Sequence, residues 1–208
     1  MSVQYLSGRV EGTLIASDVT VAHLTVKDQL VEIADVVDVP LLTQVEWEGI
    51  LGFAYGSDEM LKQKVLPFFD SVMKEQLLEQ NIFGYSIGAQ GGAFAVGGVD
   101  WSLVAGVHEG GPYKQVLDGE GSPFQWAKVV NLGYWTVGLM DIELVYPAGE
   151  TVSTGVCQGE KDGMCRGIVD TGTYLVYGPK PHVAGPLRDL QGTGCGGFGG
   201  LPSVVFVL

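Results

Sequence analysis

The chain has 208 residues, of which 46% are hydrophobic, a proportion that can fill a core and excludes a wholly disordered protein. Its 24 acidic and 11 basic residues give a net charge of −13, which repels phosphate backbones and makes nucleic acid a poor partner. The 32 glycines follow no three-residue repeat and separate short apolar runs, as is typical of sheet proteins with many tight turns.

Strands are expected throughout the first forty residues. Residues 3–16 predict two strands around a turn at Ser7-Gly8, and residues 19–26 and 30–39 each suit a further strand. No basic stretch followed by an apolar stretch occurs in the first thirty residues, so no signal peptide is visible. An apolar run punctuated by glycines follows at residues 47–52.

A helix and a glycine-rich hairpin are expected next. Pro67 suits a first helical position because its φ is fixed and it lacks an N–H. The apolar residues that recur at helical spacing after it are Phe68, Phe69, Val72, Met73 and Leu77. The uncharged run at residues 81–99 contains six glycines, so it favours two strands around Gly91-Gly92 over a membrane span.

The second half predicts further strands and one short helix. Residues 110–123 show little periodicity and are a candidate lobe junction or surface insertion. Strands are expected at residues 126–130 and 135–145, and a helix is expected after Pro179. Its apolar face would carry Val183, Leu187 and Leu190. The sequence therefore predicts a mostly β protein with two helices.

The segment with the most distinctive chemistry is Asp170-Thr171-Gly172. Two apolar β-forming residues precede it and Thr173 follows it, so a buried strand would deliver a carboxylate onto a tight turn. Gly172 would allow another backbone to approach, and the threonine hydroxyls could hydrogen-bond the carboxylate. The alternative is an ordinary β-turn in which Asp170 caps its own backbone.

Five other segments have counterparts in one protein family. Residues 3–8 (Val-Gln-Tyr-Leu-Ser-Gly) are similar to its flap, the hairpin that closes over bound peptide, and residues 47–52 (Trp-Glu-Gly-Ile-Leu-Gly) to its Phe-Asp-Gly-Ile-Leu-Gly segment. Residues 97–100 match Gly-Gly-(Ile/Val)-Asp, residues 133–135 match Gly-Tyr-Trp, and residues 201–206 match Leu-Pro-x-apolar-x-Phe. In order and approximate spacing, the whole chain resembles the pepsin-like aspartic proteases (peptidase family A1).

The resemblance implies a bilobal, mostly β fold built from double-psi β-barrel lobes. Residues 1–105 would be the remainder of the N-terminal lobe, and residues 106–208 would be part of the C-terminal lobe. Because the first catalytic aspartate of the family belongs upstream of the flap, and the last part of its second lobe belongs beyond Leu208, we expect a fragment truncated at both ends.

The resemblance also implies an aspartic endopeptidase in which Asp170 is the second-lobe catalytic aspartate. In this family two carboxylates share a proton: the charged one acts as base on a water, and the protonated one donates to the scissile carbonyl. Asp-Thr-Gly occurs once here, so we expect the 208-residue chain by itself to be inactive.

Residues that contact substrate are expected in both lobes. Tyr5 and Ser7 would belong to the flap, with an ordinary strand aromatic as the alternative for Tyr5. Trp47 and Ile50 would line the pocket for the residue before the scissile bond, with plain core packing as the alternative. The second-lobe residues expected to bind substrate are Tyr134, Gly172 and Thr173.

The cysteines favour a disulfide over a metal. The resemblance implies that Cys157 and Cys165 form the small disulfide of the second lobe, and it leaves Cys195 without a partner in this sequence. The three histidines lack ligand spacing, so no metal is expected. The resemblance implies no cofactor, a peptide or protein substrate and a monomer. It also implies a secreted protein or one of an acidic vacuolar or lysosome-like compartment, whose signal peptide is not in this chain.

Three alternatives stay open. The first is a non-catalytic relative that keeps the fold for peptide or protein binding, which the departures from the family pattern at Leu6 and Tyr174 favour. The second is an unrelated β-rich binding module in which Asp170 is a turn residue. The third is a homodimer in which two copies of Asp170 meet.

Overall fold

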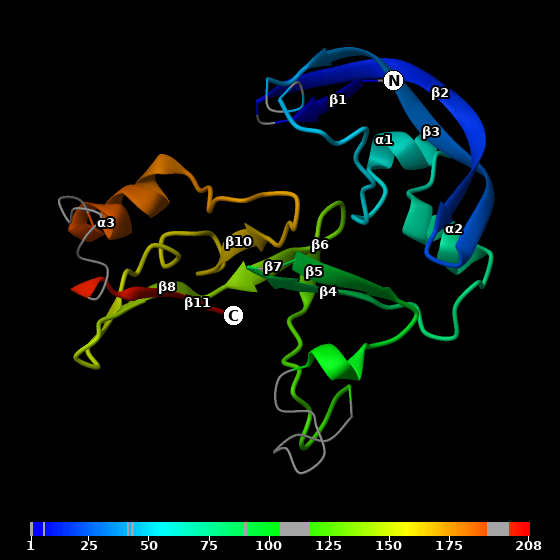
Figure 1. The fold of residues 1–208 in the computed structure, drawn as a ribbon. Coiled ribbons are helices and arrows are strands. Elements are labelled where there is room, and N and C mark those ends of the chain that lie inside the picture. The colour runs from blue at the N-terminus through cyan, green and yellow to red at the C-terminus, as the bar shows by residue number, and fades with distance from the viewer. Residues whose placement is uncertain are drawn as a thin grey trace. The chain divides into compact units, whose positions relative to one another are not determined.

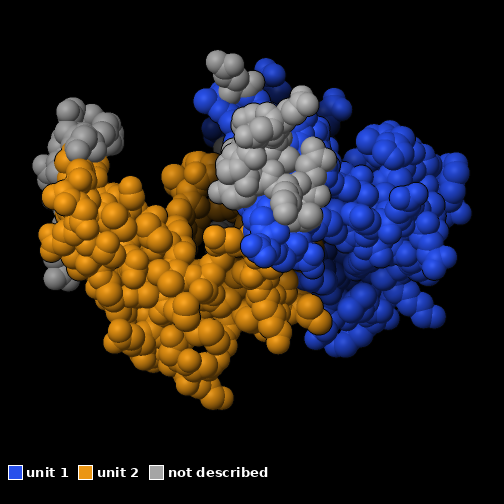
Figure 2. All heavy atoms as spheres, turned by 90° about the horizontal axis from the view of Figure 1, so that it is seen from below, with its two compact units in different colours: residues 1–124 blue, residues 125–208 orange. Residues whose placement is uncertain are grey.

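The computed structural model describes residues 2–5, 7–40, 42, 44–89, 91–104, 117–190 and 200–208, with backbone alone at residues 186–190. The described strands form four antiparallel sheets (Figure 1). The chain divides into two compact units, residues 1–124 and 125–208, which are coloured separately in Figure 2. The prediction of a mostly β protein is confirmed.

The first sheet of unit 1 has three strands in the order β1-β2-β3. These are β1 (Ser2–Tyr5), β2 (Gly8–Val21) and β3 (Leu24–Asp38). Tyr5 pairs with Gly8, so the expected tight turn between the first two strands is confirmed. β2 and β3 form a long curved ribbon (Figure 1), and its register shifts after Glu11 and again after Ser17.

The prediction of a single strand at residues 19–26 is wrong. The chain reverses within this segment, so that Val21 ends β2 and Leu24 begins β3. Ala22 adopts a left-handed φ of 52°, a conformation that glycine and asparagine usually signal in a sequence. Val19 pairs with Val26, and apolar residues continue to alternate along the chain through the turn. The sequence pattern therefore does not show that one strand ends and another begins here.

Two helices and a hairpin follow among the described residues of unit 1. The helices are α1 (Asp58–Lys62) and α2 (Phe68–Lys74), followed by β4 (Phe83–Gly88), β5 (Gly91–Val96) and the 3₁₀ turn Trp101–Leu103. The helix expected at Pro67 is confirmed, but Pro67 is its N-cap and not its first helical residue, and the helix ends at Lys74, before Leu77. The glycine-rich hairpin is also confirmed, but Gly91 and Gly92 lie in β5 and not in the turn. The short helix α1 was not predicted, although Ser57 caps it by accepting from the Met60 N–H at 3.3 Å.

The core of unit 1 joins the β2–β3 turn region to α2. Phe53 lies at its centre, with its ring 5.0 to 5.9 Å from the rings of four other phenylalanines. The buried apolar residues of this cluster are Leu24, Val26, Phe53, Phe68, Phe69 and Val72. The hairpin β4–β5 adds partly buried residues, so one core holds the three elements together.

The described residues of unit 2 form two small sheets and one helix. β6 (Val129–Asn131), β7 (Thr136–Leu139) and β10 (Cys165–Ile168) form one sheet in the order β10-β7-β6. β8 (Asp141–Val145), β9 (Thr151–Ser153) and β11 (Ser203–Val207) form the other in the order β11-β8-β9. The helix expected after Pro179 is confirmed as α3 (Lys180–Leu190).

Two expectations for unit 2 need correction. The strand predicted at residues 135–145 is two strands in different sheets, β7 and β8, with Met140 between them. The strand predicted at residues 126–130 begins only at Val129. The boundary expected after residue 105 stays a prediction, because residues 105–116 lie outside the described residues, and these include half of the segment expected to form a junction.

None of the described helices is long and apolar enough to cross a bilayer.

The phenylalanine core of unit 1 predicts a large effect of truncation at Phe68. Because Phe68 is buried against Phe53, Phe68→Ala is expected to lower the free energy of unfolding by about 3–5 kcal/mol, measured by urea denaturation. Leu61→Ala on the exposed side of α1 is the control and is expected to cost less than about 1 kcal/mol. Equal effects of the two substitutions would contradict this description of the core.

Candidate functional site

The Asp170 turn follows the last residue of β10. Pairing continues past the strand, because the Val169 N–H donates to the Trp135 carbonyl oxygen at 3.0 Å. The chain then turns, and the Asp170 carbonyl oxygen accepts from the Thr173 N–H at 3.3 Å. The end of a strand and a tight turn therefore fix the backbone of Asp170.

Both carboxylate oxygens of Asp170 accept hydrogen bonds from the same turn. The Gly172 N–H donates to Oδ1 at 2.8 Å, and the Thr173 hydroxyl donates to Oδ2 at 2.5 Å. A Cβ on residue 172 would lie 3.2 Å from Oδ1, so glycine allows this close approach. The side chain is exposed, so each oxygen keeps a further lone pair for water or a ligand.

The residues that lead into this turn are exposed, and the prediction of a buried strand is wrong here. Ile168 is 56% exposed and Val169 is 61% exposed. Successive side chains point to opposite faces of a sheet, so the described residues cover neither face of the sheet β10-β7-β6 at this point.

Tyr134 lies at the same end of this sheet as Asp170. The buried Thr136 pairs with Ile168 in the ladder, and its N–H donates to the Tyr134 carbonyl oxygen at 2.8 Å. The Tyr134 side chain is exposed. The sheet thus brings together four of the predicted site residues: Tyr134, Asp170, Gly172 and Thr173.

The disulfide implied by the resemblance is present in unit 2. Cys157 and Cys165 are bonded, with their Cα atoms 4.9 Å apart. Cys165 is the first residue of β10 and Cys157 is fully buried, so the bond anchors the start of the strand that leads to Asp170. Closing so short a loop is worth about 2–3 kcal/mol on the chain-entropy model. Cys195 lies outside the described residues.

Sequence reasoning did not identify Asp141, whose carboxylate organises the loop before Cys157. It accepts from the Ile142 N–H at 2.8 Å, the Gly155 N–H at 3.0 Å and the Thr154 hydroxyl at 3.2 Å, and also from the Ser153 hydroxyl. Burial acts to raise the pKa of this carboxyl, but the four hydrogen bonds together outweigh it and hold the pKa below its usual value.

The tip of the β1–β2 hairpin carries Tyr5 and Ser7. The Gln4 side-chain amide donates to the carbonyl oxygens of Tyr5 and Gly8, both at 2.9 Å, and so ties the two strands together at the turn. The Tyr5 pKa is raised, first by burial of its phenol and then by the negative charge of Glu32. Leu6, one of the departures from the family pattern, lies outside the described residues.

Trp47 and Ile50 lie in a segment of unit 1 that has neither helix nor strand, and both side chains are more than half exposed. Only Phe53, just after this segment, enters the core. The core-packing alternative for Trp47 and Ile50 stays open. Their proposed contact with substrate stays a prediction.

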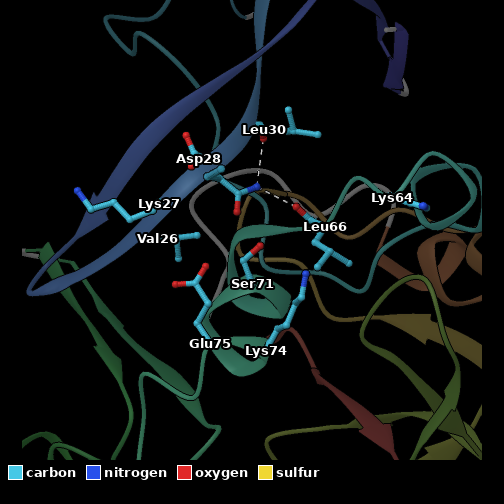
Figure 3. A pocket seen from close by; sticks show the side chains of 10 residues that line it. Val26, Lys27, Asp28, Leu30, Lys64, Leu66, Ser71, Lys74 and Glu75 are labelled. Carbon is cyan, nitrogen blue, oxygen red and sulfur yellow. Dashed lines mark hydrogen bonds between the residues drawn. The ribbon is translucent and has the colours of Figure 1, made fainter.

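A cavity of about 170 Å³ lies between β3 and α2 in unit 1 (Figure 3). Its lining includes Ser71, Lys74 and Glu75. The buried Gln29 closes one side by donating from Nε2 to the Leu66 and Leu30 carbonyl oxygens at 2.8 and 3.1 Å. None of the predicted site residues lines this cavity.

Within the described part of the chain, no three histidine, cysteine or acidic side chains come close enough together to hold a metal ion.

Comparison with known proteins gives a consistent set of relatives. The sequence matches the model of the family described as eukaryotic aspartyl protease over residues 1–195. It is 28% identical to plasmepsin VII of Plasmodium berghei over 222 residues, which cover 99% of this chain and 43% of that protein. It is 30% identical to cathepsin D of Gallus gallus over 189 residues, which cover 88% of this chain and 40% of that protein. It is 29% identical to embryonic pepsinogen of Gallus gallus over 223 residues, which cover 100% of this chain and 50% of that protein. The chain spans about half the length of the curated relatives it matches.

The hydrogen bonds of Asp141 predict a stability that depends on pH. Because the folded state lowers the pKa, the stabilisation is fully present above the unfolded value of about 3.9 and is lost as the pH falls through the folded value. Asp141→Asn is expected to lower the free energy of unfolding at pH 7 by at most about 1 kcal/mol, because solvent screens this partly exposed carboxylate, and the difference from the parent chain is expected to shrink as the pH falls below the unfolded pKa.

Urea denaturation at a series of pH values would measure this effect. Glu150→Gln, which removes an exposed carboxylate from the turn after β8, is the control and is expected to leave the pH profile unchanged. A constant difference between Asp141→Asn and the parent chain from pH 2 to pH 7 would contradict the role given to the charged form of Asp141.

Proposed function

The chain belongs to the eukaryotic aspartyl protease family, and from this premise we propose that the complete protein is an aspartic endopeptidase in which Asp170 is one of two catalytic carboxylates. The observation that carries the proposal is the Asp170 turn, in which Gly172 and Thr173 orient an exposed carboxylate. An oriented, solvent-facing carboxylate of this kind suits general acid–base catalysis.

The proposed reaction needs a second carboxylate facing Asp170. Two carboxylates that close cannot both ionise cheaply, so they share one proton, as is general for aspartic proteases. The charged member takes a proton from the water that attacks the scissile carbonyl carbon. The neutral member donates its proton to the carbonyl oxygen. The pair of carboxylates therefore still holds one proton, and the tetrahedral intermediate forms without a net charge.

The second carboxylate would come from another Asp-(Thr/Ser)-Gly turn outside these 208 residues. The sequence contains this tripeptide pattern once, at Asp170. The chain spans about half the length of the curated relatives that it matches. In this proposal the 208 residues supply one half of the catalytic pair and the hairpin that covers it.

The substrate would be an extended peptide, held by the β1–β2 hairpin and by residues near the Asp170 turn. Tyr5 and Ser7 at the hairpin tip would cover the reacting groups and exclude water from them. Trp47 and Ile50 are exposed apolar side chains, which suits contact with apolar residues next to the scissile bond. Tyr134, Gly172 and Thr173 would contact the peptide from the second lobe.

The proposed location is an oxidising compartment of the secretory pathway, an acidic vacuole or lysosome-like compartment, or the extracellular space. The Cys157–Cys165 disulfide supports this, because such bonds persist in oxidising compartments. The net charge of −13 fits an acidic setting, where partial protonation of carboxylates would relieve repulsion.

A non-catalytic relative that binds peptides is the second candidate, and the single Asp-Thr-Gly segment is the observation that favours it. The two candidates differ in the complete protein. The enzyme requires a second aspartate turn and cleaves peptides, whereas the binding protein lacks both.

The need for a second carboxylate predicts that the purified 208-residue chain is inactive. At acidic pH, denatured protein substrate is expected to show no cleavage that pepstatin inhibits. Cleavage by this chain at a rate comparable to a pepsin-like enzyme, abolished by pepstatin, would contradict the proposal and would favour a pair formed by two copies of Asp170.

Replacing Asp170 in the complete, active protein tests its role directly. Asp170→Asn keeps the size of the side chain but removes its proton chemistry, so kcat is expected to fall at least about a thousandfold. Asp162→Asn, which removes an exposed carboxylate before β10, is the control and is expected to keep kcat within about twofold. Unchanged activity of Asp170→Asn would contradict the catalytic role proposed for this residue.

A further inference from the structure

The segment that follows the Asp170 turn is held by few contacts of its own. In the described part of the chain, residues 174–178 make no backbone hydrogen bond. The side chains of residues 174–177 are all more than half exposed. The last backbone hydrogen bond of the turn runs from the Thr173 N–H to the Asp170 carbonyl oxygen at 3.3 Å. The position of this segment therefore depends on where the next element, α3, is attached.

The first turn of α3 presents one side chain to the rest of unit 2. The His182 and Val183 N–H groups both donate to the Pro179 carbonyl oxygen, at 2.8 and 3.2 Å, and this fixes the backbone of the turn. Among the side chains of α3 that the structure describes, those of His182 and Val183 alone are partly buried. Val183 lies over the chain just before the helix, since a Cβ on Gly178 would be 2.7 Å from its Cγ1. This leaves His182 to connect α3 to other elements.

His182 meets Glu160 in the disulfide loop, which we define as residues 157–165. Its Nε2 lies 3.0 Å from Oε1 of Glu160, and the His182 side chain is 25% exposed. The Glu160 backbone is itself fixed, because its N–H donates to the Cys157 carbonyl oxygen at 3.1 Å. The contact therefore joins the start of α3 to the loop that anchors β10.

This contact completes a closed path of the chain around Asp170. β10 runs from the disulfide loop to the turn, and α3 follows the turn. Both sides of the turn are thus attached to one loop, the first by the disulfide and the second by the contact of His182. A displacement of α3 would pull on Thr173, whose hydroxyl donates to Oδ2 of Asp170 at 2.5 Å.

The strength of the contact depends on pH, because it joins two groups that titrate. Glutamate and histidine side chains ordinarily titrate near pH 4.3 and pH 6.5, so they carry opposite charges between about these two values. Above this window the imidazole is neutral and the attraction between charges is lost. Below it the carboxyl group is neutral, with the same result. The contact is therefore strongest at mildly acidic pH.

No other described charge on the disulfide loop or on α3 takes the place of this carboxylate. In the loop, Asp162 binds Arg166 at 2.5 Å, and Lys161 is exposed and has the wrong sign. On α3, the exposed Lys180 lies two positions before the histidine, and residues at that spacing do not face each other on a helix.

We propose that His182 and Glu160 are positioning residues for Asp170, which form a clamp between α3 and the disulfide loop when both are charged. The inference rests on the proposed function, because it assumes that Asp170 is catalytic. It adds that the catalytic turn is held most firmly at mildly acidic pH and is released toward neutral pH. The clamp acts through the orientation of Asp170, so it affects kcat and not KM.

Limited proteolysis of the purified 208-residue chain tests the clamp without catalysis. Thermolysin cleaves before apolar residues such as Leu175 and Val176, and mass spectrometry would identify cleavage within residues 174–178. At about pH 5.5, Glu160→Gln is expected to raise the initial rate of this cleavage about threefold, as befits the loss of one partly exposed ion pair. At about pH 8 the variant and the parent chain are expected to be cleaved at equal rates.

Two controls isolate the ion pair. In a His182→Gln background, Glu160→Gln is expected to change the cleavage rate at neither pH. Asp162→Asn removes another carboxylate from the disulfide loop and is expected to leave the pH dependence of cleavage unchanged. The positive end of the α3 dipole opposes a charged His182 equally with and without Glu160, so it cancels in the comparison.

The kinetics of the complete protein test the positioning role. At about pH 5.5, Glu160→Gln is expected to lower kcat about twofold and to leave KM unchanged. The ratio of the two kcat values is expected to approach one as the pH rises above about 6.5. A purely structural role of Glu160 would not produce this pH profile.

The possible failures separate the inference from its premise. An equal effect of Glu160→Gln on cleavage at both pH values, or no effect at either, would overturn the clamp whatever the activity of the complete protein. A clamp in the 208-residue chain with unchanged kcat in the complete protein would overturn the positioning role and leave the proposed function standing. A complete protein that cleaves no peptide would contradict the proposed function, and with it the positioning role.

Discussion

The orientation of one carboxylate depends on a series of local contacts in unit 2. The Asp170 oxygens are held by the Gly172 N–H and the Thr173 hydroxyl, and these groups are in place only because β10 ends at this turn. β10 is an edge strand, so its position depends on its pairing with β7 and on the disulfide at its first residue. Asp141 extends the series by holding the loop that leads to Cys157. Small contacts far from Asp170 thus determine where its charge points.

In unit 1, a glycine without a side chain leaves room for the side chain of a residue on the neighbouring strand. Gly12 gives room to Glu32, whose side chain lies over β2 at this point. The phenylalanine core around Phe53 stabilises the other end of the same long strands, away from the hairpin tip. The hairpin can therefore carry polar and charged groups at its tip while its far end is fixed by apolar packing.

Much of this arrangement could be predicted from local sequence, and the rest could not because it depends on contacts between distant residues. The tight turn between β1 and β2 and the helix after Pro67 follow from turn and helix signals within a few residues. The reversal at Ala22 has no such signal, since the register of the long β2–β3 ladder imposes it. Asp141 also escaped prediction, because its donors from residues 153–155 come together only when β8 pairs with β9. The exposure of Ile168 shows the same limit, since an apolar β-former does not reveal whether another element covers its face of the sheet.

The central claim is that the Asp170 carboxylate faces a second carboxylate across a shared proton. The distance between Asp170 and its nearest carboxylate, measured in a crystal structure of the complete protein, tests this most directly. The account predicts a second aspartate, from another Asp-(Thr/Ser)-Gly turn, with an oxygen within about 3–4 Å of Asp170 and one water bound by both. A complete protein in which Asp170 faces only solvent would contradict the account.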